Sequence, residues 1–326
     1  MKTPWTANNI PSQEGRRVVI TGANSGIGFH TALELARHGA ELILPARTEA
    51  KAHAAVERIR AEVPDAKVLA EIVDLADQSS VRAFAARTIK RFPGRSLDLL
   101  INNAGVMAIP RREVTVDGFE RQFATNYLGP FALTALLLPS IRPQPGSRIV
   151  TVCSNAGKYG KIEFDNLQSE RHYGPMFGAY TQSKLADLIF TLELQRRLST
   201  AHSPILSVAA HPGYAVTNLH DSGPGAGNSP MKMMLNLLHP LSQDAHHGAL
   251  PTLFAAVSPN AQPGGYYGPD GFLETKGNPA AAKIPAAAKD QAVAARLWEE
   301  SERLTGGTFA SIGSLTRADL HHVPSV

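Results

Sequence analysis

Residues 17–28 have the sequence Arg-Val-Val-Ile-Thr-Gly-Ala-Asn-Ser-Gly-Ile-Gly, in which an apolar run leads directly into a turn with three glycines. The apolar run predicts a buried strand, and the alanines and leucines that follow as far as Gly39 predict a helix. A glycine-rich turn in this position lets the backbone approach a pyrophosphate at the helix N-terminus. An ordinary tight turn is the alternative, but three glycines at this spacing favour a dinucleotide site.

The alternation of strand and helix continues along most of the chain. Further strands are predicted over residues 41–46, 67–73, 97–101, 147–152, 205–209 and 265–268. Helices are predicted between and after them, over residues 49–62, 77–92, 116–138, 180–194, 245–256 and 286–304. This order predicts an α/β fold, a doubly wound parallel sheet of the Rossmann type with helices on both faces, in a single domain over residues 1–304.

Several segments depart from this regular order. Pro45 lacks a ladder donor, so we expect the strand 41–46 to stop early or bulge there. Pro130 should kink the helix predicted over residues 116–138. Residues 220–240 hold glycines and prolines around a methionine-rich stretch, which fits either core packing or a lid over an apolar substrate. Residues 305–326 lack periodicity and are expected to form a loose C-terminal tail.

The composition limits the classes of function. A formal charge of +4 with dispersed basic residues argues against a nucleic-acid partner. Cys153 is the single cysteine, so an intrachain disulfide is excluded and a reducing compartment is expected. No apolar run reaches the length of a membrane span, and the first residues lack a signal-peptide core, so we expect a cytoplasmic protein. We expect no metal site, and the sequence leaves the oligomeric state open.

Polar residues follow the predicted strands at their carboxyl ends. Asp74 and Leu75 follow the third strand, Asn102–Gly105 follow the fourth, and Ser154 follows the fifth. Right-handed crossovers bring these ends to one edge of a parallel sheet, where ligands bind. Each group could also be a simple turn or helix cap. The second strand ends at Arg47 with no acid, which favours the 2′-phosphate of NADP over the free ribose of NAD, unless Arg47 only caps a solvated loop.

Tyr180 and Lys184 are four residues apart in a predicted helix, which places them on one face, one turn from each other. A nearby ammonium favours the phenolate form, which would make Tyr180 an acid–base group near neutral pH. A surface pair is the commoner meaning of this spacing in isolation, so the interpretation depends on the accompanying motifs.

Five motifs in the right order make residues 15–270 resemble the short-chain dehydrogenase/reductase family. Residues 21–28 resemble its TGxxxGxG loop, and Asn103-Ala104-Gly105 its NAG motif. The resemblance implies an Asn-Ser-Tyr-Lys tetrad of catalytic residues at Asn126, Ser154, Tyr180 and Lys184. It assigns these further residues to the cofactor: Gly22, Asn24, Ser25, Gly26, Ile27, Gly28, Arg47, Asp74, Leu75, Asn103, Ala104, Gly105, Pro212, Gly213 and Thr217, with Tyr180 and Lys184 shared.

The branch of the family is indicated by residues 164–170 and by His211-Pro212-Gly213, which resemble retinol-dehydrogenase-like members. The resemblance implies NADP(H) as cofactor and an apolar alcohol, aldehyde or ketone as small-molecule substrate. Tyr180 would move the proton, Ser154 would bond the substrate oxygen, Lys184 would bond the nicotinamide ribose, and Asn126 would hold a water. An NADP-binding sensor or scaffold without turnover is the alternative, although such proteins usually lose the tyrosine or the lysine.

Overall fold

The computed structural model describes residues 4–214 and 243–315. Thr217, which the resemblance assigns to the cofactor, and the segment 220–240, expected to be either core or a lid, lie outside the described residues. Within the described part, no helix combines the length and the apolar character needed to cross a membrane.

An eight-stranded sheet forms the centre of the molecule, in the order β3-β2-β1-β4-β5-β6-β7-β8. All neighbouring strands are parallel except β7 and β8. The strands are β1 Arg17–Ile20, β2 Glu41–Ala46, β3 Val68–Ile72, β4 Leu99–Asn102, β5 Arg148–Val152, β6 Leu206–Ala210, β7 Tyr266–Pro269 and β8 Pro279–Ala281. The predicted doubly wound parallel sheet is confirmed, and the short antiparallel strand β8 is an addition.

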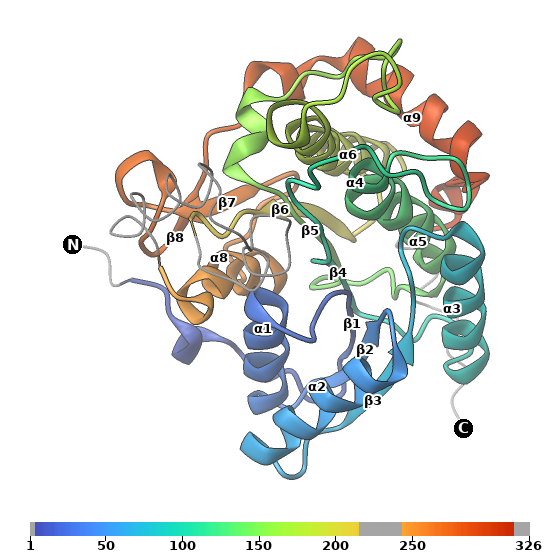
Figure 1. Cartoon of the computed structure of the whole chain (residues 1–326). Helices are drawn as coiled ribbons and strands as arrows, with labels where there is room; N and C mark the ends of the chain where they lie inside the picture. The colour runs from blue at the N-terminus through green and yellow to red at the C-terminus, as the bar shows by residue number, and fades with distance from the viewer. Residues whose placement is uncertain (1–3, 215–242, 316–326) are drawn as a thin grey trace.

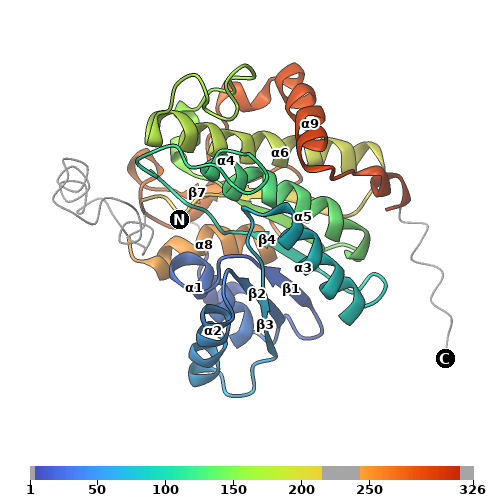
Figure 2. The ribbon, with the colours of Figure 1, turned by 45° about the vertical axis from the view of Figure 1, so that its right-hand side comes forward.

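Helices cover both faces of this sheet (Figures 1 and 2). One face carries α1 (Gly26–Arg37), α2 (Glu49–Glu62) and α8 (Ala245–Val257), and the other carries α3 (Gln78–Arg91), α5 (Gly129–Leu137), α6 (Thr181–Thr200) and α9 (Gln291–Thr305). Successive residues of each strand point into opposite cores, for example Val18 into one and Val19 into the other. The strands therefore consist of nearly continuous Val, Ile and Leu, as expected when both faces are buried.

Pro45 does not end or bulge β2, so that expectation was wrong. The strand continues to Ala46, and Pro45 pairs in register with Glu71 of β3. Backbone N–H groups along β2 point alternately to its two neighbours, since Glu41 N donates to Arg16 O and Leu42 N donates to Lys67 O. The missing donor of Pro45 would face β1, whose pairing with β2 has already ended at Ile43, so no bond is lost.

The helix predicted over residues 116–138 is shorter and interrupted. It begins at Arg121 with α4 (Arg121–Phe123), continues as a π-helical turn over Ala124–Leu128, and becomes α5 at Gly129. Pro130 has no N–H to donate back along the helix, so the wider turn is accommodated there. The predicted kink is therefore present as a π turn that contains Asn126.

The chain after α9 is not loose as far as the structure describes it. Phe309, Ile312 and Leu315 are buried in the same core as α5 and α6. The Phe309 ring lies 4.4 Å from the Trp298 ring and 5.1 Å from the Phe131 ring, centroid to centroid. The expectation of a loose tail from residue 305 is wrong for residues 305–315, because spaced apolar residues can pack without forming a periodic element.

Candidate active site

A cavity of about 520 Å³ opens at the carboxyl edge of the sheet. It lies across the loops after β1 and β4, the neighbouring strands at which the strand order reverses. Doubly wound sheets bind ligands at this switch point. All the predicted cofactor residues in the described part line this cavity except Gly213.

The glycine-rich loop passes very close to the loop after β4. Gly22 has a φ of +69°, and an added Cβ there would lie 2.8 Å from Ala104 Cα. An added Cβ at Gly28 would lie 2.3 Å from Asn103 Nδ2. Asn103 Nδ2 in turn donates to Thr21 O at 2.9 Å. These contacts join the two predicted cofactor motifs into one wall, and they require glycine because a side chain at either position would collide with the neighbouring residues.

Two basic side chains lie where the second strand meets the cavity. Arg47 and Lys51 both line it, beside Pro45 and Ala46. Lys51 belongs to the first turn of α2, where its N–H donates to the Thr48 hydroxyl at 3.4 Å. The sequence analysis did not identify Lys51 as a candidate cofactor-binding residue. The signal was its position four residues after Arg47, just inside a helix that starts with the capping residue Thr48.

Asp74 and Leu75 line the cavity beyond β3. The Asp74 carboxylate accepts from Ala76 N at 2.9 Å, and Asp74 N donates to the Ser80 hydroxyl at 2.9 Å. This tight turn holds the carboxylate at the edge of the sheet, where the resemblance implies a contact with the cofactor.

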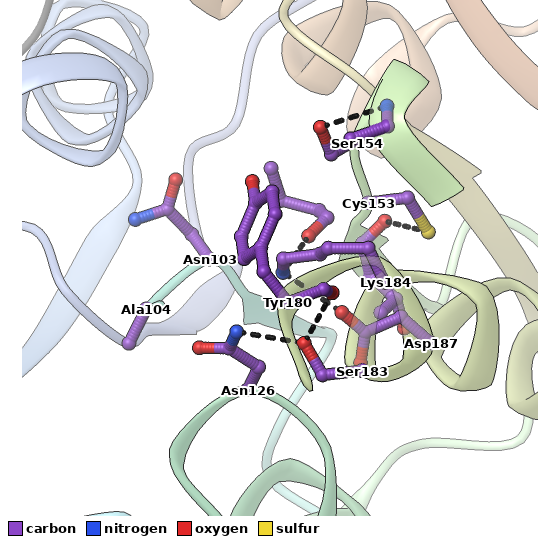
Figure 3. Close-up of polar contacts among 12 residues, drawn as sticks. Asn103, Ala104, Asn126, Cys153, Ser154, Tyr180, Ser183, Lys184 and Asp187 are labelled. Carbon is purple, nitrogen blue, oxygen red and sulfur yellow. Dashed lines mark hydrogen bonds and ion pairs between the residues drawn. The ribbon is translucent and has the colours of Figure 1, made fainter. Parts of the chain in front are cut away.

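Tyr180 and Lys184 are both buried side chains that line the cavity. Tyr180 ends a π-helical turn over Pro175–Tyr180, and Lys184 lies in the first turn of α6. The Lys184 ammonium donates to Val152 O at 3.0 Å and to the Asp187 carboxylate at 2.8 Å (Figure 3). The structure thus places the predicted pair together and adds Asp187, which the sequence analysis did not identify.

Asn126 lies behind the cavity wall. Its side chain accepts from Val106 N at 2.7 Å and donates to Val106 O at 2.9 Å and to the Ser183 hydroxyl at 2.9 Å. An added Cβ on Gly105 would lie 3.3 Å from Asn126 Oδ1 and 3.6 Å from Lys184 Nζ, so both groups converge there. The amide therefore fixes the loop after β4 against α6, a role that its sequence position alone did not indicate.

Ser154 follows β5 and caps the short helix Asn155–Tyr159. Its hydroxyl oxygen accepts from Ala156 N at 3.2 Å. Among the described residues, no acceptor contacts the hydrogen of the Ser154 hydroxyl. A serine hydroxyl can both accept and donate, so Ser154 remains able to donate to a further oxygen.

The segment His211–Gly213 borders the cavity after β6, with Pro212 in its lining. Gly213 N donates to His211 Nδ1 at 3.2 Å, which leaves Nε2 to donate to Glu274 at 3.0 Å. Burial lowers the pKa of His211, although Glu274 raises it, and the ring is neutral near pH 7. Glu274 also pairs with Lys158 at 2.7 Å. This network, absent from our predictions, joins the segment after β6 to the one after β5.

Four large apolar side chains are exposed on the segments around Ser154 and Tyr180. Asn155 donates to Leu273 O at 2.9 Å, so the Asn155–Tyr159 and Phe272–Glu274 segments lie together. The third segment is the π turn that ends at Tyr180. The exposed residues are Tyr159 at 77%, Phe177 at 75%, Phe272 at 75% and Leu273 at 69%.

The comparisons with known proteins agree with this geometry. Residues 16–224 match the short chain dehydrogenase family. The chain is 42% identical to human retinol dehydrogenase 13, over 94% of this chain and 90% of that protein. It is 39% identical to mouse polyprenol dehydrogenase, over 91% of this chain and 86% of that protein.

Among solved structures, an uncharacterized protein from Mycobacterium Paratuberculosis is 42% identical with a TM-score of 0.77, covering 94% of this chain and 99% of that one. The family match spans the glycine loop, the tetrad positions and the segment after β6. The chain therefore belongs to the short chain dehydrogenase family and is retinol-dehydrogenase-like, with the oxidoreductase chemistry of alcohols and carbonyls that this implies.

Proposed function

We propose that this protein interconverts an apolar alcohol and its aldehyde or ketone with NADP(H), with Tyr180 as the acid–base group. The observation that carries the proposal is that buried Tyr180 and Lys184 line the same cavity as the glycine-rich loop. A dinucleotide bound along that loop would therefore extend toward a phenol that has an ammonium beside it. NADP(H) would supply or take up the hydride when bound.

The residues present fit such a cofactor. A side chain at Gly22 would collide with Ala104, and one at Gly28 would collide with Asn103, so glycine is needed at both positions for the two motifs to pack together at the cavity. Asp74 follows β3 and Pro212 follows β6, which lie on opposite sides of the switch point, and both residues line the cavity. The residues that the resemblance assigns to the cofactor thus line one cavity, apart from Gly213 and the undescribed Thr217.

The preference for NADP(H) is supported by Arg47 and Lys51. Both line the cavity at the end of β2, where an acid would otherwise contact the ribose of NAD. A guanidinium can donate two hydrogen bonds to one phosphate, and an ammonium adds a second positive charge. Ala46 takes the place of an acid that would repel the phosphate.

An apolar substrate is supported by Tyr159, Phe177, Phe272 and Leu273, which expose large apolar surfaces on the segments around Ser154 and Tyr180. Large apolar side chains that are exposed close to a site can contribute to the binding of an apolar ligand. Two relatives are named as dehydrogenases of retinol and polyprenol, which are both apolar alcohols.

In this account the four tetrad residues have distinct roles. Tyr180 donates its proton to the carbonyl oxygen in reduction and removes it from the hydroxyl in oxidation. Ser154 donates a hydrogen bond to the same oxygen as negative charge develops. Lys184 stabilises the phenolate by its charge, and Asn126 holds the loop that carries Gly105 against α6.

A screen of NADPH oxidation tests the proposal. Apolar aldehydes, aryl ketones, quinones and steroid-like ketones are offered in turn, with NADH in parallel and the Tyr180→Phe variant as a blank. We expect turnover of at least one apolar carbonyl with NADPH and none with the variant. Binding of NADPH without turnover of any of these carbonyl compounds would instead favour a sensor or scaffold.

A further inference from the structure

Tyr180 directly precedes α6, and Lys184 and Asp187 follow it at positions i+4 and i+7 within α6, so the three side chains lie along one side. The Lys184 and Asp187 side chains are 6% and 2% exposed. In Figure 3 the Lys184 ammonium lies between the Tyr180 ring and the Asp187 carboxylate. Lys184 and Tyr180 line the cavity, whereas Asp187 does not.

The Lys184 ammonium has two hydrogen-bond partners in the described part of the protein. An ammonium has three N–H donors. Val152 O, whose residue also lines the cavity, and the Asp187 carboxylate, whose residue does not, take two of them. The contacts among the described residues leave the third donor without a partner, and Lys184 itself lines the cavity. Asp187 therefore orients the ammonium, and its negative charge offsets part of the positive charge that Tyr180 experiences.

We propose that Asp187 is a positioning residue for the reaction, which holds Lys184 toward Tyr180 and screens the charge that Lys184 presents to the phenol. This inference rests on the proposed role of Tyr180. The Lys184–Asp187 contact lies inside the protein, so its effect on Tyr180 can be measured without cofactor or substrate.

The other titratable groups that face this pair are neutral near pH 7. Burial raises the pKa of Cys153, at the end of β5, and of Tyr127, in the π turn Ala124–Leu128. Burial also raises the pKa of Tyr266, in β7. Burial alone would lower the pKa of Lys184, but Asp187 and Tyr180 raise it, so the lysine stays charged. Burial raises the pKa of Asp187 to about 6, although Lys184 lowers it, so near pH 7 Asp187 is the anion that balances Lys184 within the described residues.

Asp187→Asn is the direct test, because it keeps the shape and an acceptor oxygen but removes the charge. Ionisation of Tyr180 is followed in the cofactor-free protein by the ultraviolet absorbance of tyrosinate across pH. Each curve is corrected by the same protein carrying Tyr180→Phe, so that the other tyrosines cancel. Seven helical residues span about 10 Å, and a unit charge at that distance with an effective dielectric constant near 20 is worth about one pH unit.

We expect Asp187→Asn to move the Tyr180 ionisation to lower pH by about one unit. An unchanged curve, or a move to higher pH, would overturn the proposal. Asp187→Ala, which is smaller, tests the same loss of charge if the asparagine variant does not fold.

Asp98→Asn is the matched control, because Asp98 is also buried and ion-paired, with Arg142, but precedes β4 at the opposite edge of the sheet. It should lower stability and leave the Tyr180 curve unchanged. A shift of equal size in this control would also overturn the proposal. If the proposed function were wrong, the substrate screen would fail while the titration result stood.

Discussion

Two basic residues at the end of β2 provide the sharpest test of cofactor choice. Arg47→Ala should weaken NADP(H) binding by about ten- to a hundredfold, because a charge-assisted contact to the 2′-phosphate is lost. Lys51→Ala should weaken it less, since an ammonium makes no two-pronged contact. NAD(H) binding should change little in either variant. Fluorescence titration of both cofactors measures these affinities.

Arg60→Ala is the control for these variants, because Arg60 also lies on α2 but donates to Val68 O and does not line the cavity. It should change neither affinity. Equal losses of NADP(H) and NAD(H) in Arg47→Ala would mean that Arg47 supports the loop and does not contact the phosphate.

At this scale the sequence identified the residues better than their contacts. Tyr180 and Lys184 were predictable from helical spacing, and the structure places both in the cavity. The hydrogen bonds of Asn126 to Val106 were not predictable, because the two residues are far apart in the sequence and come together only in the folded protein. Asp187 was visible in the same spacing, but an acid one turn after a lysine usually forms an exposed pair, and only burial distinguishes this one.

At the scale of elements, Glu274 joins three segments at the edge of the site. Its carboxylate contacts His211, Lys158 and the backbone N–H of Lys283. The His211 hydrogen bond, with those of Lys158 and Lys283, lowers the pKa of Glu274 from 4.5 to about 2 in spite of partial burial. Because the pKa of Glu274 is lower in the folded protein than in the unfolded chain, the ionised carboxylate stabilises the fold at any pH above the pKa of the unfolded chain. This contribution is lost as the pH falls toward about 2.

Glu274→Gln should therefore lower the free energy of unfolding at pH 7 by about 1 kcal/mol, a value kept small because the group is partly exposed. The difference from the unmodified protein should stay constant above about pH 5 and narrow below it. Urea unfolding between pH 7 and pH 3 measures it. Glu57→Gln, at an exposed position of α2, should show no such difference. A gap that stayed the same at low pH would show that the charge of Glu274 is not what stabilises the loop.

The elements themselves were largely predictable, since apolar runs and glycine or proline boundaries mark most strands and helices. Pro45 shows the limit, because its effect depends on which neighbour its missing N–H would face, and that is set by the ends of the pairing with β1. The π turn around Asn126 shows a second limit. Pro130 predicts that the helix is distorted, but it does not predict that the distortion is a π-helical turn. Strand β8 has only three residues and no pattern of its own.

For the whole molecule, the packing of residues 305–315 onto the core is the main feature that the sequence did not predict. Phe309 belongs to an aromatic cluster with Phe131, Phe190 and Trp298, contributed by α5, α6 and α9. Its neighbours are far away in sequence, so no local pattern marks it as a core residue.

Phe309→Ala should lower the free energy of unfolding by about 3 kcal/mol, because it removes a buried ring and leaves a cavity. Val116→Ala, at a side chain that is 84% exposed, should change it by less than about 0.5 kcal/mol. Denaturant unfolding compares the two. Equal small effects would show that the segment contributes little to the core.

The most direct test of the account is turnover by Tyr180→Phe, measured with NADPH and the best carbonyl substrate, alongside the Kd of NADPH. Loss of the proton donor should lower kcat by about 10²–10⁴-fold, while the Kd should stay within a few-fold, because the glycine loop and Arg47 are untouched. Turnover near that of the unmodified protein, with cofactor binding intact, would contradict the assignment of Tyr180 as the acid–base group.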